Sequence, residues 1–243
     1  MSTLDDARAR LRALADPEHA RTLQGYFRTG PGGYAEGDRF LGIRNPVLRG
    51  LARELPALSL EEAEELLRSP FHEERLLALL VLVRAYARGD AARRQRIHEL
   101  YLAATRFVNN WDLVDLSAEH LVGAHLRGGD RSLLDRLAAS DSVWERRIAI
   151  LATFHSIRRG ELADTFRVAA LLVRDRHDLI HKAVGWMLRE AGKRDRAAEE
   201  AFLREHCREM PRTMLRYAVE RFPEPLRQAY LRGEPPAPEA AIP

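Results

Sequence analysis

The stretch SPFHEERLLALLVL, residues 69–82, returns in altered form three times along the chain and decides the expected fold. The later copies are SDSVWERRIAILAT at 140–153, RHDLIHKAVGWMLRE at 176–190 and MPRTMLRYAVERF at 210–222. Each copy places a basic residue before small or aliphatic residues at helical spacing, and no stretch shows a convincing period of two. The sequence therefore predicts an all-α protein.

The basic residues of these segments, with one tryptophan between them, follow one another at intervals of 34 to 36 residues. They are Arg75, Trp111, Arg147, Lys182 and Arg216. A period of this size in helix pairs is typical of an α-solenoid of HEAT-like repeats, in which each unit buries its apolar face against the next. We therefore expect these residues, with Asp115 and Trp186, along one concave basic groove of a single repeat domain over residues 1–232.

Several helix boundaries are legible in the sequence. Asp16 and Asn45 each precede a proline and are predicted N-caps, and Ser59 with Glu62 has the spacing of a capping box. Gly89 marks a helix end. The Pro/Ala-rich residues 233–243 are expected to be disordered.

Composition bounds the classes of function. The 243 residues are 46% hydrophobic, which suffices for a sizeable core, and the net charge is +3. Of the 39 basic residues all but Lys182 and Lys193 are arginine, which suits phosphate binding, although a bias in genomic base composition would raise arginine as well. A single cysteine, Cys207, excludes an intramolecular disulfide framework and fits a reducing cytosol. No apolar run or signal core appears, so we expect a cytoplasmic protein without a targeting segment. That it is a nucleoid-associated monomer is an expectation that comes only with the resemblance given below.

Other catalytic classes find little support. His177 and His181 stand four residues apart, but without a further ligand pattern we expect no metal. The Gly-rich segment 29–45, TGPGGYAEGDRFLGIRN, follows no strand and lacks the GK[ST] ending of a phosphate-binding loop. No Gly-x-Ser-x-Gly elbow is present.

Trp111 and Asp115 are the main candidates for chemistry. In the stretch WDLVD they stand four residues apart, on one side of a helix expected to open at Asn110. An indole beside a carboxylate suits a substrate that carries or develops positive charge. Two structural alternatives stay open: a tryptophan on a helix often packs in the core, as we expect for Trp144, and a carboxylate near a helix N-terminus stabilises the helix dipole.

Four motifs, in this order and at repeat spacing, resemble those of the AlkD-like DNA alkylation repair proteins. They are FLGIRNPVLRGLA at 40–52, NNWDLVD at 109–115, SVWERRIAIL at 142–151 and HKAVGWMLREAGK at 181–193. The resemblance runs from Tyr26 to Phe222. It implies HEAT-like repeats and an alkylpurine DNA glycosylase of base excision repair, acting on 3-methyladenine and 7-methylguanine in double-stranded DNA without a cofactor.

The resemblance also implies roles for residues. Asp115 corresponds to the catalytic carboxylate, Trp111 and Trp186 to its two indoles, Arg147 to the active-site arginine and Tyr26 to an aromatic that faces the lesion. This chain carries a long 29–45 loop as one branch of the family does, which leaves its substrate range open.

The remaining cations are expected to contact DNA phosphates. The candidates are Arg147, Lys182, Arg44, Arg49 and Arg189. The main alternative is a non-catalytic repeat protein that binds damaged or branched DNA, and a third possibility is a scaffold that binds an acidic peptide in the same groove.

Overall fold

The computed structural model describes residues 3–55 and 58–236. Within these ranges the regular structure is helical, and the sole strand-like pairing is an isolated parallel bridge between Arg39 and Phe71. The predicted all-α class is confirmed. The contacts between residues cluster into two compact units, Met1–Leu121 and Val122–Pro243. One continuous repeat domain over residues 1–232 stays a prediction.

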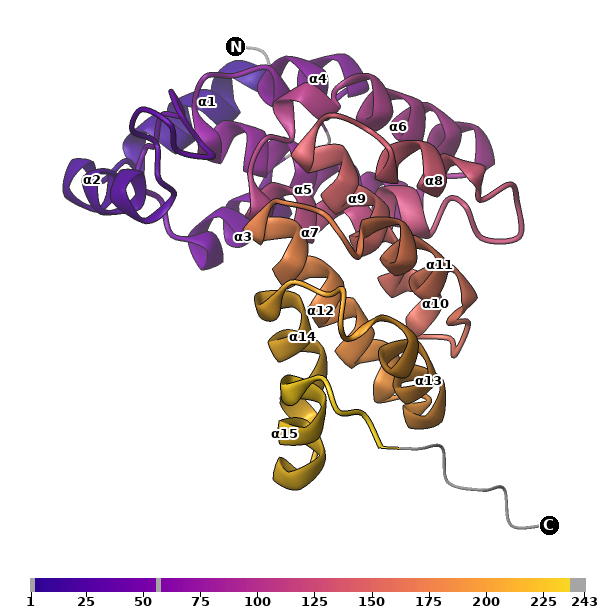
Figure 1. Cartoon of the computed structure of the whole chain (residues 1–243). Coiled ribbons are helices and arrows are strands. Elements are labelled where there is room, and N and C mark those ends of the chain that lie inside the picture. Colours follow the sequence, from indigo (N-terminus) through magenta and orange to yellow (C-terminus); the bar gives the residue numbers. More distant parts are fainter. Residues whose placement is uncertain (1–2, 56–57, 237–243) are drawn as a thin grey trace. The chain divides into compact units, whose positions relative to one another are not determined.

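The first unit is built around one long buried helix. Its helices are α1 (Thr3–Ala13), α2 (Pro17–Tyr26), α3 (Asn45–Glu54), α4 (Leu60–Leu67), α5 (His72–Arg88), α6 (Ala91–Ala103), the 3-10 turn η1 (Thr105–Phe107) and α7 (Trp111–Ala118). Every residue of α5 from His72 to Leu80 is buried, and α5 packs against α3, α4, α6 and α7 (Figure 1). A helix apolar on most sides needs neighbours all round, which explains its central place.

The second unit repeats this arrangement around α12. The unit begins within the π-helical turn η2 (Glu119–Gly123). The helices of the second unit are α8 (Ser132–Ala138), α9 (Val143–Ala152), α10 (Phe154–Ile157), α11 (Ala163–Leu172), α12 (Asp178–Gly192), α13 (Arg196–His206), α14 (Arg212–Ala218), η3 (Val219–Arg221) and α15 (Glu224–Arg232). α12 packs against α9, α11, α13 and α14, and Figure 1 shows it between α13 and α14.

Each unit contains a row of helices in successive contact, α3, α5 and α7 in the first and α9, α12 and α14 in the second. Packing of neighbour on neighbour is solenoid-like. The residues spaced at 34 to 36 all fall on helices of these rows. The expectation that Arg75 lines an open groove is nevertheless wrong. Arg75 is only 4% exposed, because the carboxylate of Asp38, in the 29–45 loop, binds its guanidinium.

Most predicted helix boundaries are confirmed. Asp16 caps α2 by accepting from the backbone N–H groups of residues 18 and 19, Ser59 and Glu62 form the reciprocal capping box of α4, and Gly89 follows α5. Asn45 is a wrong prediction, since it is the first residue of α3 and Arg44 precedes it without a side-chain cap. The chain entering α3 is held instead by a carboxylate of α5, described below.

Trp144 packs in the core of the second unit, as predicted, with 9% of its surface exposed. Gly233, in the left-handed conformation at φ 78°, ends α15. Residues 237–243 of the predicted disordered tail lie outside the described residues. None of the helices in the described ranges is long and apolar enough to cross a membrane.

Candidate active site

α7 presents Trp111 and Asp115 together. Asn110 caps the helix, as predicted, and its Oδ1 accepts a hydrogen bond from the backbone N of Trp111 at 2.8 Å. Leu113 and Val114 are fully buried on the side that packs in the first unit. Trp111 and Asp115 stand one turn apart and are half-buried, so both reach the surface on neighbouring turns.

Trp111 is held in an aromatic cluster from the N-terminal part of the chain. Its indole stacks on Phe27 with ring centroids 5.5 Å apart, and Tyr26 meets it edge-on at 6.2 Å. The indole Nε1–H donates to the hydroxyl of Tyr34 at 3.3 Å. Tyr26 is 64% exposed, so it leaves the outer side of the cluster accessible. Three partners therefore fix the orientation of the indole.

Asp115 lies near the buried phenol of Tyr101. The Tyr101 hydroxyl pairs with the Ser117 hydroxyl at 2.9 Å, and burial, with a smaller effect of the Asp115 charge, raises the pKa of Tyr101. The phenol therefore stays neutral beside the carboxylate.

A buried network of charged side chains next to Trp111 was not predicted from the sequence. His72, at the start of α5, lies between two carboxylates: its Nδ1 is 3.1 Å from Asp38 Oδ2 and its Nε2 is 2.8 Å from Asp112 Oδ2. Arg75 donates to the other oxygen of Asp38 at 2.5 Å. All four side chains are at most 9% exposed. Two cations thus balance two anions inside the fold.

The charges of this network follow from its geometry. Burial opposes a charged His72 imidazole, but its hydrogen bonds to Asp112 and Asp38 outweigh burial and raise the pKa of His72 to about 9. Burial likewise opposes a charged Asp38, yet His72 and Arg75 hold the pKa of that carboxyl below its usual range. At neutral pH the histidine is therefore an imidazolium that donates to both carboxylates.

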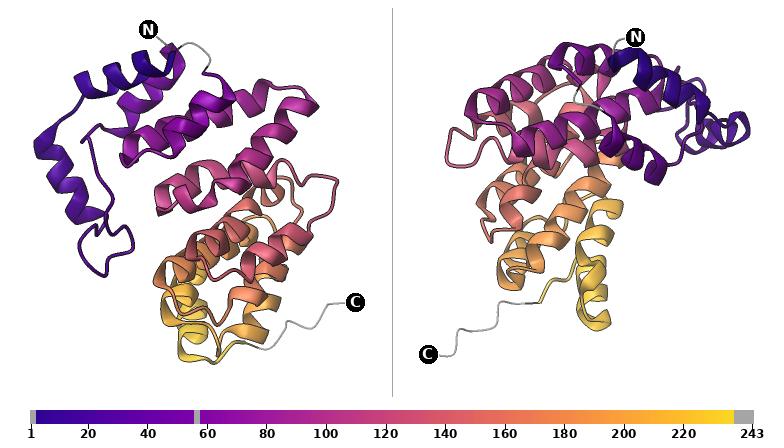
Figure 2. Two further views of the ribbon diagram at one scale, coloured as in Figure 1. Left: turned by 90° about the horizontal axis from the view of Figure 1, so that it is seen from above. Right: turned by 180° about the vertical axis from the view of Figure 1, so that it is seen from behind.

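The 29–45 loop is fastened to α5 by the residue after this histidine. The carboxylate of Glu73 accepts from the backbone N–H groups of Leu41, Gly42 and Ile43 at 2.8, 2.8 and 3.2 Å. Gly42 has φ +87°, and a Cβ there would stand 2.0 Å from the carbonyl oxygen of Asp16, so only glycine fits. Figure 2 shows this loop folding back after α2 before the chain enters α3. The loop is an integral part of the site.

A cavity of about 310 Å³ lies inside this arrangement. Tyr26, Phe27, Phe40 and Trp111 contribute aromatic walls, and His72 and Asp112 contribute polar groups. Arg44, predicted to bind phosphate, is exposed and also lines the cavity. Arg49, the other candidate on α3, is exposed as well.

The predicted residues of the second unit gather on α9 and α12. Trp186 is half-buried, its Nε1 donates to Glu190 Oε1 at 3.2 Å, and its ring lies 5.9 Å from that of Phe154. Arg189 forms an ion pair with Glu220 and keeps 18% of its side chain exposed. Both residues have acidic neighbours.

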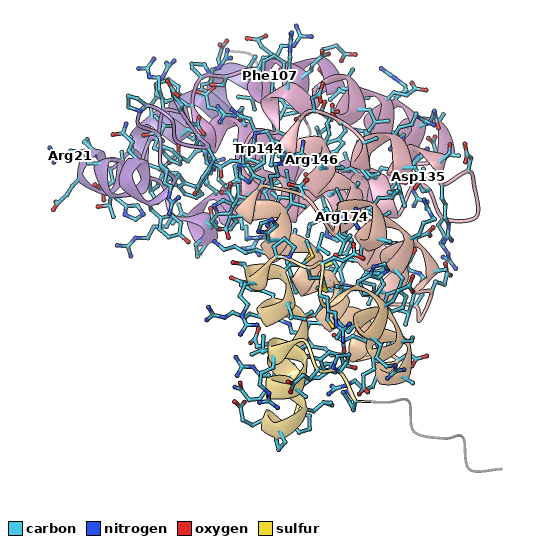
Figure 3. All side chains as sticks on the ribbon, in the orientation of Figure 1. Arg21, Phe107, Asp135, Trp144, Arg146 and Arg174 are labelled. Carbon is cyan, nitrogen blue, oxygen red and sulfur yellow. The ribbon has the colours of Figure 1, made fainter. Side chains whose placement is uncertain are left out.

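The remaining two candidates differ in accessibility. Arg147 is 5% exposed and donates to the backbone oxygen of Leu179 at 2.5 Å, which links α9 to α12. The neighbouring Arg146, labelled in Figure 3, pairs with Asp175 at 2.7 Å. Lys182 has a 42% exposed side chain and pairs with Asp178 at 2.6 Å. A contact of Arg147 with DNA stays a prediction, and Lys182 is the more accessible cation.

A second cavity of the first unit is basic. It has a volume of about 290 Å³, and Arg53, Arg84, Arg88 and Arg93 line it. Arg84 and Arg88 belong to the last turns of α5, about 18 Å and about 24 Å along that helix from His72. Within residues 3–55 and 58–236, no group of three or more His, Cys, Asp or Glu side chains could hold a metal ion.

The fold and the site define an all-α, solenoid-like protein in which the Trp111 indole lines an aromatic-walled cavity and Asp115 stands one helical turn further along α7. The chain belongs to the family of DNA alkylation repair enzymes, which it matches over residues 7–222. It is also similar to the solved structure of a predicted DNA alkylation repair enzyme from Enterococcus faecalis, at 18% identity and a TM-score of 0.63, with 86% of this chain and 96% of that chain covered. At this identity the likeness shows the fold alone.

No curated protein matches the sequence. Membership in the family supports an enzyme that binds DNA and takes part in the repair of alkylated DNA.

Proposed function

We propose that the protein is a DNA glycosylase that hydrolyses the N-glycosidic bond of cationic alkylated purines, such as 3-methyladenine and 7-methylguanine, in double-stranded DNA. The observation that carries this proposal is the placement of Trp111 and Asp115 one turn apart on α7, with the indole fixed by Phe27, Tyr26 and Tyr34. A fixed π face and a nearby carboxylate complement positive charge at two points.

Cleavage of the glycosidic bond in a cationic purine nucleotide needs little more than stabilisation of positive charge. Alkylation at N3 or N7 makes the purine cationic, so the bond from C1′ to the base breaks with its electron pair passing to the base, which leaves neutral. Positive charge then builds on the deoxyribose, where the Asp115 carboxylate stabilises it. Water adds its oxygen to C1′ and its proton passes through Asp115 to solvent. No metal or organic cofactor takes part.

The second unit would contribute to binding. Trp186 offers a second indole for the cationic nucleotide, and Lys182 can exchange its partner Asp178 for a DNA phosphate. Arg44 and Arg49, exposed on the first unit, are the other candidates for phosphate contacts. Arg189 would have to leave Glu220 to do the same.

Release of methylated bases from DNA tests the proposal. Duplex DNA treated with a methylating agent is incubated with the protein, and free 7-methylguanine and 3-methyladenine are quantified by chromatography. The glycosylase proposal predicts multiple turnovers with release of both bases. Binding to the same DNA without any released base would favour the non-catalytic DNA-binding alternative.

A further inference from the structure

The basic cavity of the first unit lies where two helices end and a third begins. Its volume of about 290 Å³ is at the lower end of the range for small-molecule pockets. The last turn of α3 supplies Arg53, the end of α5 supplies Arg84 and Arg88, and the first turn of α6 supplies Arg93. Three of these arginines are exposed, and Arg84 is half-buried. Four guanidinium groups therefore meet at one cavity.

These guanidinium groups have no carboxylate partner among the residues that the structure describes. The acidic residues next to them in the sequence are already bound. Glu54 pairs with Arg10 at 2.6 Å. Asp90 caps α6 and accepts a hydrogen bond from the backbone N–H of Arg93 at 2.8 Å. The cavity therefore keeps a positive charge that the surrounding side chains do not balance.

The needs of the helix ends do not explain this arrangement. Arg84 and Arg88 stand four residues apart on one face of α5, where like charges repel each other. Arg93 stands in the first turn of α6, where a cation opposes the helix dipole. A different arginine, Arg94, donates to two carbonyl oxygens in the last turn of α5, at 3.1 and 3.4 Å. An anion in the cavity would relieve the repulsion.

The cavity also has apolar surface. Ala52 is buried on α3, and Val81 and Ala85 are half-buried one turn apart on α5. A Cβ added at Gly89 would stand 3.2 and 3.3 Å from Cβ and Cδ of Arg93. The glycine thus lets the stem of Arg93 lie close over the turn between α5 and α6. Exposed cations and apolar side chains are therefore combined in one cavity.

We propose that this cavity binds an organic polyphosphate, in which two or three linked phosphate groups are joined to a compact planar or apolar body, as in a nucleoside di- or triphosphate. Guanidinium groups bind phosphate oxygens in bidentate geometry and stack on planar rings. A terminal phosphate carries a charge of about −1.5 to −2 at pH 7, so a short phosphate chain balances the four arginines. The apolar side chains contact the body of the ligand.

This cavity is separate from the proposed site for alkylated DNA. His72 lines the cavity beside Trp111, and Arg84 and Arg88 lie about 18 Å and about 24 Å along α5 from it. The phosphates of a DNA strand need exposed cations but make no use of apolar surface inside a cavity. The combination of the two therefore favours a small ligand over a DNA strand.

Calorimetric titration of the full-length protein tests this site. The ligands are ATP, inorganic tripolyphosphate, which lacks the nucleoside, and adenosine, which lacks the phosphates. We expect ATP to bind most tightly, and tripolyphosphate to bind about threefold or more weakly because it buries no apolar surface. No binding of ATP at millimolar concentration, or equal binding of adenosine, would overturn the proposal. Tripolyphosphate that binds as tightly as ATP would overturn the contact with an organic body.

Two double variants locate the site. Arg84→Gln combined with Arg88→Gln should weaken the binding of ATP and of tripolyphosphate about tenfold or more, because hydrogen bonds between charged groups are lost. The matched control combines Arg12→Gln and Arg21→Gln, at exposed arginines of α1 and α2, of which Arg21 is labelled in Figure 3. This control removes the same charge and should leave both affinities unchanged. Equal weakening by the two double variants would overturn the site.

A single variant tests the apolar surface. Ala85→Leu adds volume at the cavity without a change of charge, and both residues favour a helix. It should weaken the binding of ATP while tripolyphosphate binds as in the wild type, and an unchanged affinity for ATP would overturn the apolar contact. Thermal unfolding of each variant checks that it is folded. Loss of affinity for duplex DNA by Arg84→Gln with Arg88→Gln, in a protein that binds no ATP, would assign these arginines to DNA instead.

Discussion

The buried pair of contacts around His72 makes the stability of the first unit dependent on pH. In the folded protein the pKa of His72 is raised to about 9 from an ordinary value of 6.5. A histidine with a raised pKa contributes its full stability below the unfolded value and loses that contribution as pH rises through the folded value. The window is therefore pH 6.5 to 9, and a shift of this size corresponds to about 3 kcal/mol.

Urea unfolding of the wild type and of His72→Gln at pH 6 and pH 9.5 measures this contribution. The variant should be less stable than the wild type at pH 6, and this deficit should shrink by about 3 kcal/mol at pH 9.5. A deficit of His72→Gln that is the same at both pH values would refute an imidazolium held between Asp38 and Asp112.

Three further outcomes are expected. Burial raises the pKa of Glu199 to about 8, so its contribution to stability is lost between pH 4.5 and 8, and Glu199→Gln should stabilise the protein at pH 8 but not at pH 4.5 in thermal unfolding. Gly42→Ala should destabilise by more than about 1 kcal/mol in urea unfolding because of its φ and the close carbonyl, whereas Gly25→Ala, a helical position with no atom within 4 Å of the added Cβ, should be neutral or stabilising. Lys182→Ala should reduce the slope of log affinity against log salt concentration by about one unit, as measured by fluorescence anisotropy with DNA. The matched control Lys193→Ala should leave this slope unchanged, and an unchanged slope for Lys182→Ala would remove Lys182 from the DNA contacts.

Local features of the fold could be predicted because their causes are local. The caps at Asp16, Ser59 and Asn110 each depend on a side chain and backbone within three residues, and the structure confirms them. The repeat spacing likewise placed Arg75 on α5 and Lys182 on α12, the central helix of each unit. It could do so because each helix pair with its turns takes a similar number of residues.

Long-range contacts could not be predicted in the same way. The partners of His72 lie 34 and 40 residues away, in a loop and on another helix, and no spacing pattern connects them. The burial of Arg75 has the same cause, since its partner Asp38 comes from the loop. The run of His72, Glu73 and Glu74 directly before the apolar stretch of α5 was the available signal, because charged residues that are buried need partners.

The most direct test of the proposed chemistry is the rate of 7-methylguanine release by Asp115→Asn, measured beside the affinity of the same variant for the same DNA. The proposal predicts that release falls by at least a hundredfold, about 3 kcal/mol, while affinity stays within a few fold, because the carboxylate acts on charge that develops in the transition state. Asp141→Asn, at an exposed aspartate just before α9, should release the base at the wild-type rate. Release by Asp115→Asn at close to the wild-type rate would contradict the assignment of Asp115 as the catalytic carboxylate.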